Sequence, residues 1–212
     1  MPGDATAVFD QVSAHDSNSL LRPDMVTLIL TNTEGRGPNV MTAAWWMVAG
    51  YGPFRYLLSV DHKTYTYELI EENPEFVMAV PTAELIDAVA LCGLVSGRAV
   101  DKLTHLDLET VPGQSVDVPL LREAVGNIEC RVTASFDHEG NTYYFAAVET
   151  AHVQPGGLDG RLLSLKTDPL AYMGSDYLDA GGKARFYVDL DGCDLRWVGD
   201  EQALAGISED PP

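Results

Sequence analysis

Short apolar runs separated by turn residues dominate the pattern of the chain. The first, at 25–31 (MVTLILT), is rich in β-branched residues and is followed by two glycines, a proline and an asparagine. That combination is typical of a strand that ends in a turn. Similar runs recur, and the last of them alternates apolar with polar positions. The predicted strands are 25–31, 40–48, 55–60, 76–80, 127–136, 142–153 and 185–190.

Two segments have the 3.6-residue period of a helix. In 64–73 (TYTYELIEEN) threonines can cap the start, and Asn73-Pro74 stops the helix. In 82–91 four apolar residues recur on one face. The stretch 96–102 is expected to be a polar turn that leads into a single helical turn.

Many short strands with few helices favour a mainly β fold with helical additions, built on a barrel. The chain has 212 residues, of which 46% are hydrophobic, enough for one domain with extensions. We divide it into an N-terminal arm (1–22) that packs on a neighbour, a barrel domain (23–180) and a C-terminal extension (181–212) with a mobile end.

The charge balance excludes one class of partner. Thirteen Lys and Arg stand against 32 Asp and Glu, giving a formal net charge of −19. Such a surface repels DNA and RNA. The even spread of acids indicates adaptation to high salt, where self-repulsion is screened; ordinary acidic solubility is the alternative.

Cysteines and apolar stretches bear on location. Cys92, Cys130 and Cys193 are far apart and odd in number, which argues against a disulfide scaffold or a zinc knuckle. No apolar run approaches the ~20 residues of a membrane-spanning helix, and the first residues lack the pattern of a secretory signal. We therefore expect a cytoplasmic protein that does not engage a membrane.

The familiar catalytic motifs are missing. There is no G-x-G-x-x-G after a strand, no G-x-x-x-x-G-K-[ST] and no G-x-S-x-G, and the five histidines form no H-E-x-x-H. We therefore assign no catalytic side chain and no metal ligand. Redox or transfer chemistry would have to come from an organic cofactor.

Five segments, in order over about residues 25–178, resemble the signatures of the flavin reductase-like family, which includes flavoredoxin. The stretch around CGLVSGRAVDK is the most specific. The segments are 39–45 (NVMTAAW), 64–70 (TYTYELI), 92–102 (CGLVSGRAVDK), 151–153 (AHV) and 168–172 (DPLAY).

The resemblance implies a split β-barrel that binds flavin mononucleotide (FMN), usually as a homodimer with the flavin in a groove near the interface. It implies an oxidoreductase that passes electrons from NADH or NADPH through FMN to an acceptor, which can be a redox protein. The family often has Arg where this chain has Thr64, with the base one residue earlier at Lys63.

The start of the helix at 64–73 suits the flavin phosphate. The first N–H groups of a helix have no internal partner, and that end attracts anions. We therefore assign Thr64 and Thr66 to the phosphate, with Lys63 adding charge. Plain helix capping is the alternative.

The remaining candidates surround the flavin ring. Ser96, Gly97 and Arg98 form a turn beside Lys102, which matches a family lysine that contacts flavin; a cation stabilises the reduced ring. Arg98 either positions a phosphate or pairs with Asp101.

Asn39 and Trp45 lie six apart, so one extended strand would put them on one face, with Trp46 turned into the core. By the resemblance, His152 contacts flavin and Tyr172 covers the ring, while Cys92 is a small buried residue. The ring-edge candidates are Asn39, Met41, Thr42, Ala43 and Trp45.

Two other functions remain open. An FMN-binding electron carrier without NAD(P)H activity fits the −19 charge, because at low salt that charge repels an anionic nucleotide and attracts a basic protein. A split barrel that has lost its flavin and serves a structural role is the third.

Overall fold

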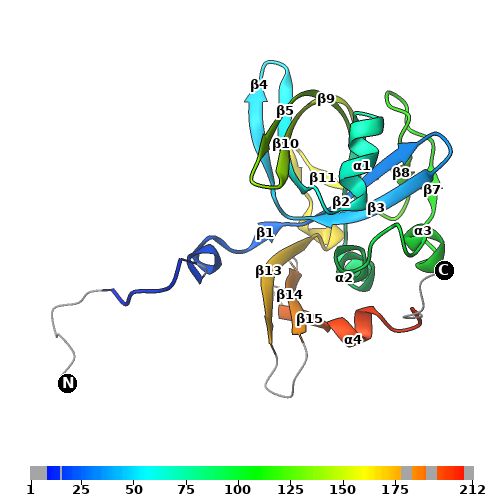
Figure 1. The fold of residues 1–212 in the computed structure, drawn as a ribbon. Helices are drawn as coiled ribbons and strands as arrows, with labels where there is room; N and C mark the ends of the chain where they lie inside the picture. The colour runs from blue at the N-terminus through cyan, green and yellow to red at the C-terminus, as the bar shows by residue number, and fades with distance from the viewer. Residues whose placement is uncertain (1–8, 15, 178–182, 190–194, 208–212) are drawn as a thin grey trace, which may run out of the picture.

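A computed structural model describes residues 9–14, 16–177, 183–189 and 195–207. Its largest unit is a seven-stranded antiparallel sheet of order β3-β2-β6-β9-β10-β5-β4. Figure 1 shows this sheet strongly curled. Its strands are β2 (Thr27–Thr33), β3 (Gly37–Ala43), β4 (Trp46–Tyr51), β5 (Phe54–Asp61), β6 (Glu75–Val80), β9 (Gly126–His138) and β10 (Asn141–Val153).

Helix α1 (Tyr65–Glu72) packs against β2, β3 and β5. Thr64 is its N-cap and Asn73 its C-cap, so the predicted helix at 64–73 is confirmed. The side chains of Leu69 and Ile70 are buried, and that burial holds the amphipathic helix on the sheet.

A second, four-stranded sheet has the order β1-β13-β14-β15. Helix α2 (Ile86–Leu94) lies between the two sheets: it packs on β2 and β3 on one side and on β15 and α4 on the other (Figure 1). The elements of this layer are β1 (Asp24–Met25), β13 (Leu170–Tyr177), β14 (Lys183–Asp189), β15 (Leu195–Gly199) and α4 (Asp200–Ala203).

Short elements fill the connections. They are η1 (Asp16–Leu21), η2 (Ala83–Leu85), α3 (Lys102–His105), β7 (Thr110–Val111), β8 (Leu120–Leu121), β11 (Leu158–Asp159), β12 (Leu162–Leu163) and η3 (Leu165–Thr167). No described helix is long and apolar enough to cross a membrane.

Two hydrophobic clusters make up the core. One fills the curl of the large sheet and includes Ile29, Phe76 and Tyr144. The other surrounds α2 and includes Leu28 and Val89. Strand β2 contributes to both clusters because successive side chains point to opposite faces. This explains why its sequence is continuously apolar rather than alternating.

The expected mainly β architecture is confirmed, and one predicted strand is wrong. The run 40–48 is two strands, β3 and β4, interrupted at Ala44 and Trp45. They lie at opposite edges of the large sheet, so the chain has to leave one edge before it joins the other. Asn39 and Trp45 therefore share no face: Asn39 is buried, whereas Trp45 is 63% exposed.

Other predictions needed smaller changes. The helix at 82–91 begins as η2 and continues as α2 to Leu94, and strands β13 and β15 were missed. The long hairpin turns through Glu139 and Gly140 alone, both at positive φ, as a tight two-residue turn requires.

The N-terminal arm leaves the body of the molecule (Figure 1). Its described part contains η1, which has no buried residue, and Phe9, Leu20 and Leu21 are exposed. Packing of this arm on a neighbour stays a prediction. Residues 1–8 of the arm, and 181–182, 190–194 and the predicted mobile end 208–212 of the extension, lie outside the described residues.

Candidate functional site

A cavity of about 920 Å³ opens where the two sheets and α2 meet. One wall is the end of β3 and the connection to β4, residues 41–45. Residues 59–61 of β5 and the α2 residues Val89 and Gly93 adjoin it. The opposite wall comes from β13 and β14, and residues of the N-terminal arm border the opening.

Close packing of α2 on β3 shapes the first wall. The hydroxyl of Thr42 donates to the carbonyl of Val89 at 2.5 Å. A Cβ placed on Gly93 would lie 3.4 Å from Cβ of Thr42, at van der Waals contact, so α2 and β3 lie close together here. Trp45 stands at the edge of this wall, and its carbonyl accepts from the N–H of Ser59 at 3.0 Å. Because Trp45 is 63% exposed, its ring is available to a ligand.

Trp46, the next residue, belongs to the core as expected. It packs on the cluster inside the large sheet, with its ring edge-on to Tyr56 at 5.5 Å. The two adjacent tryptophans thus have different environments, one lining the cavity and one stabilising the fold.

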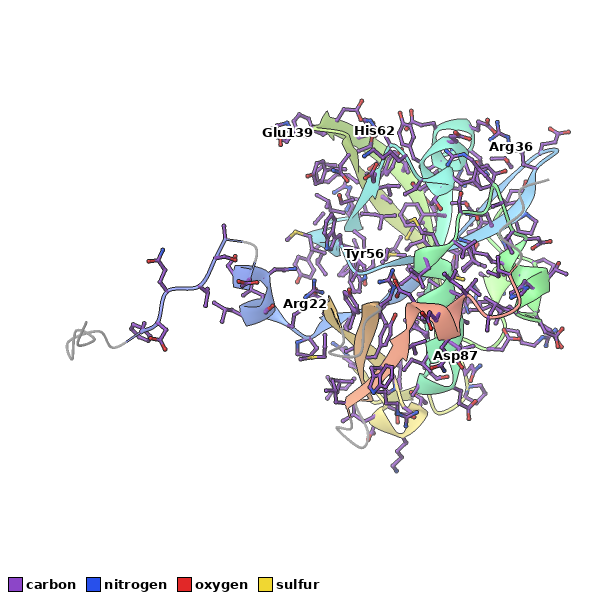
Figure 2. All side chains as sticks on the ribbon, turned by 60° about the horizontal axis from the view of Figure 1, so that its bottom comes forward. Arg22, Arg36, Tyr56, His62, Asp87 and Glu139 are labelled. Carbon is purple, nitrogen blue, oxygen red and sulfur yellow. The ribbon has the colours of Figure 1, made fainter. Side chains whose placement is uncertain are left out.

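Aromatic and cationic groups form the opposite wall. Tyr172 lies 5.6 Å from Tyr187 between ring centroids. The guanidinium of Arg22 lies 4.8 Å from the centroid of Tyr172 and pairs with Asp24. Figure 2 shows Arg22 where the arm joins the body. The cavity therefore has an aliphatic and backbone side facing an aromatic and cationic side.

Asn39 joins three of the sequence motifs away from this cavity. Its side-chain NH₂ donates to the hydroxyls of Thr66 at 3.1 Å and Thr31 at 3.3 Å. A Cβ placed on Gly97 would lie 2.1 Å from Oδ1 of Asn39 and 2.8 Å from Cδ1 of Tyr65. The buried polar cluster of Asn39, Thr31 and Thr66 thus requires glycine at position 97.

This contact gives a direct prediction. Gly97→Ala forces Asn39 and Tyr65 to move, and we expect a loss of about 1–3 kcal/mol in the free energy of unfolding, typical of overpacking. Urea titration of Gly97→Ala, Asn39→Ala and the double variant measures it. The double variant should lose less than the sum, because Asn39→Ala makes room; strict additivity would contradict the contact.

The start of α1 has the geometry of an anion site. The Thr64 hydroxyl accepts from the N–H of Tyr67 at 3.2 Å and donates to the carbonyl of Asp61 at 2.8 Å. The N–H groups of Tyr65 and Thr66 have no acceptor within the helix. Lys63 is exposed beside them. The hydroxyl oxygen of Thr66 accepts from Asn39, so the O–H and the backbone N–H of Thr66 remain as donors for an anion.

Arg98 is attached to this helix start. Its guanidinium donates to the carbonyls of Lys63 at 2.9 Å and Thr64 at 3.3 Å, and to the carboxylate of Glu68 at 2.7 Å. Arg98 thereby lowers the pKa of Glu68. The proposed pairing of Arg98 with Asp101 is wrong, because Asp101 instead caps α3 through the N–H of Thr104. Arg98 thereby links the 96–98 turn to α1, and within this turn the Ser96 hydroxyl accepts from the N–H of Arg98 at 3.2 Å.

Lys102 is the first residue of α3, and its Nζ reaches the C-terminal end of α2. It is 4% exposed, and Nζ donates to the carbonyls of Val95 at 3.0 Å and Cys92 at 3.4 Å. A cation there complements the negative end of the helix, while burial lowers the pKa of Lys102. With Asn39 and Gly97 it lines a second cavity of about 570 Å³ rather than the larger one.

His152 has a different partner again. Its Nε2 lies 2.6 Å from the carboxylate of Glu129, which is completely buried. His152 lines neither cavity. Its contact with Glu129 at the end of β10 favours a structural role, and the contact with flavin that the resemblance implies stays a prediction.

Comparisons with known proteins identify the fold. A family model described as "Flavin reductase like domain" matches residues 21–181. The chain belongs to the flavin reductase-like family.

Individual relatives agree with this membership. An uncharacterized protein of Archaeoglobus fulgidus is 37% identical over 136 residues, 64% of this chain and 75% of that protein. The flavoredoxin of Desulfovibrio vulgaris matches with a TM-score of 0.66 at 23% identity, covering 96% of this chain and 98% of its own. An NADH:FAD oxidoreductase of Streptomyces globisporus gives 0.61 at 18%, covering 90% and 98%. The expected split-barrel fold is confirmed.

The structure sorts the candidate flavin residues of this flavin reductase-like chain into three places. The larger cavity takes Met41, Thr42, Ala43, Trp45 and Tyr172. The smaller cavity takes Asn39, Gly97 and Lys102. The helix start gathers Lys63, Thr64, Thr66, Ser96 and Arg98. His152 lies in none of these three places.

Several lining residues escaped the sequence analysis. Val89 was predicted only as part of the helix at 82–91, and Gly93 only as part of the segment 92–102. Arg22, Arg185 and Tyr187 were not singled out at all. The sequence shows a proline after Arg22 and alternating apolar and polar residues at 185–190. Neither feature indicates that these segments line one cavity with β3.

Proposed function

We propose that the protein is an FMN-dependent oxidoreductase that passes electrons from NADH or NADPH through bound FMN to an acceptor. The observation that carries the proposal is the 920 Å³ cavity walled by the signature residues 41–45. Its volume falls within the roughly 300–1,000 Å³ of small-molecule sites. The family's name and the NADH:FAD oxidoreductase that shares the fold support it.

The residues present fit FMN. The Met41 side chain and the backbone at Gly93 line the cavity with apolar groups, and Trp45 and Tyr172 offer aromatic faces for the ring. The start of α1, with Thr64 and Lys63, offers N–H groups and a cation for the phosphate. When bound, FMN accepts a hydride and releases electrons one or two at a time.

The protein's own part is positioning and exclusion of water. Thr42 fixes α2 against β3, so the wall is rigid before any ligand arrives. No histidine lines the described cavity. Orientation by the walls, rather than proton transfer by a side chain, is what these residues supply.

We propose a homodimer with the flavin site near its interface. Met47 and Tyr51 of the edge strand β4 are 60% and 83% exposed, beside Trp45 at the cavity. Exposed apolar residues that gather on an edge strand favour a protein interface. The second candidate function, an electron carrier without NAD(P)H activity, is favoured by the −19 charge, which attracts a basic partner.

An absorbance spectrum separates these functions. Purified protein is incubated with FMN, passed through gel filtration, which also gives its mass, and mixed anaerobically with NADH or NADPH. Retained flavin that bleaches supports the oxidoreductase. Retained flavin that no nucleotide bleaches supports the carrier, and protein that takes up no FMN contradicts both.

A further inference from the structure

One side of the cavity comes from outside the matched family domain. The family model ends at residue 181, yet Arg185 and Tyr187 of β14 line the cavity. Strand β14 reaches it because it pairs with β13, where Tyr187 lies opposite Tyr172. The C-terminal extension therefore contributes to the site directly.

Arg185 is held less firmly than the other arginine of this wall. The Arg22 side chain is 7% exposed, pairs with Asp24 and stacks on Tyr172. Arg185 is 16% exposed, and its one ion pair within the described residues is with Asp200 at 3.9 Å, beyond hydrogen-bond distance. Among the described residues no hydrogen bond holds its guanidinium, so its donors are open to a ligand there.

Arg22 and Arg185 are two cations in one cavity of a chain that is strongly acidic. The chain has 13 Lys and Arg against 32 Asp and Glu. The lining of this cavity holds two arginines and two aspartates, Asp16 and Asp61, so it is less acidic than the molecule as a whole. This lining therefore repels an anionic substrate less than the acidic surface as a whole does.

We propose that Arg185 is a specificity-determining residue that binds a phosphate group of the reduced nicotinamide dinucleotide. Guanidinium binds phosphate through two parallel N–H···O bonds. Arg22 keeps Tyr172 in place while Arg185 exchanges its long contact with Asp200 for the phosphate. This inference rests on the proposed NAD(P)H-dependent function and deepens it.

The competing role for Arg185 is structural. Asp200 starts α4, so the ion pair could serve only to hold that helix. Asp200→Asn removes the same pair but leaves the guanidinium, and it therefore separates the two roles.

The test uses FMN-loaded protein. Rapid mixing gives the Kd for NADH and for NADPH from the saturation of flavin reduction, and calorimetry gives the Kd for ADP and for adenosine 2′,5′-bisphosphate. Arg185→Gln should raise these Kd values about 10- to 100-fold, the loss of a charge-assisted hydrogen bond. Arg185→Lys should recover part of the affinity, and the Kd for FMN should stay unchanged.

The nucleotides also tell which phosphate is bound. A loss confined to NADPH and the 2′,5′-bisphosphate assigns Arg185 to the 2′-phosphate. An equal loss for all four assigns it to the phosphates next to the 5′ carbon. Asp200→Asn frees the guanidinium from its ion pair and should therefore raise none of the four Kd values. Arg161→Gln, at an exposed position outside the cavity, should leave all four unchanged.

Three results would overturn the inference. Unchanged nucleotide Kd values in Arg185→Gln would do so, as would an equal loss in Asp200→Asn, which would make the role structural. A loss of FMN affinity alone would place the flavin phosphate there instead. If the unaltered protein takes up no FMN, or is not reduced, the proposed function itself fails, and this inference fails with it.

Discussion

Glu129→Ala is expected to lower the free energy of unfolding by about 3–5 kcal/mol. The Glu129 carboxylate is fully buried and accepts from the N–H groups of Ser115 at 2.6 Å, Val116 at 2.9 Å and Gln114 at 3.0 Å. His152 adds a fourth contact at 2.6 Å. Removing the carboxylate leaves buried donors without a partner, each costing roughly 1–3 kcal/mol before the loop relaxes.

Glu129→Gln is the matched control. One amide oxygen can still accept from the N–H groups, and the NH₂ can donate to His152, so less than half of the loss is expected. Urea unfolding followed by circular dichroism measures both variants. Equal losses in the two would show that the negative charge, which glutamine lacks, makes Glu129 necessary, rather than the volume and hydrogen bonds that glutamine keeps.

The same group predicts a pH dependence. Burial by itself raises the pKa of Glu129, but the His152 contact and the bonds from Ser115, Val116 and Gln114 lower it overall. A carboxyl whose pKa is lower in the folded state contributes stability above its unfolded pKa of about 4.3. That stability is lost as the pH falls further, through the folded pKa. Acid unfolding of Glu129→Gln should therefore show a shallower fall over this range.

The sequence predicted the strands better than the contacts between them. Apolar runs are a local signal, and most became strands of the large sheet. Whether 40–48 is one strand or two depends on where its ends join the sheet, which the run itself does not encode. Strand β15 (LRWVG) is exposed on most positions and lacks an apolar run.

In the site too, the sequence showed local motifs but not the contacts between distant segments. The motif around residues 41–45 marked the wall that lines the cavity. Glu129 looked like an ordinary acid in a strand, because its burial depends on the 114–116 segment folding over it. Arg185 meets residues more than 140 positions earlier, and only the pairing of β13 with β14 brings it there.

Lys102→Met is expected to lower the free energy of unfolding by about 2 kcal/mol at neutral pH. The variant keeps most of the side-chain volume but loses the charge-assisted bonds to the carbonyls of Val95 and Cys92 that end α2. Lys166→Met, at an exposed position, is the control and should stay within about 0.5 kcal/mol. Urea unfolding of both variants measures the difference.

The flavin potential of Lys102→Met decides what this lysine does. The family resemblance predicts that Lys102 contacts the flavin directly. Loss of that contact in Lys102→Met would weaken FMN binding and lower the reduction potential of the flavin. The bonds of Nζ at the end of α2 instead predict lost stability with an unchanged potential. A lowered potential in a variant of full stability would favour the flavin contact.

The pH dependence gives an independent check on Lys102, because its pKa is lowered by burial. The unfolded chain then binds the proton more tightly than the folded one, so this group's contribution to stability rises with pH from the folded pKa toward about 10.4. The stability difference between the unaltered protein and Lys102→Met should therefore grow over that range. A constant difference would mean that the ammonium group is solvated in the folded protein, which its 4% exposure argues against.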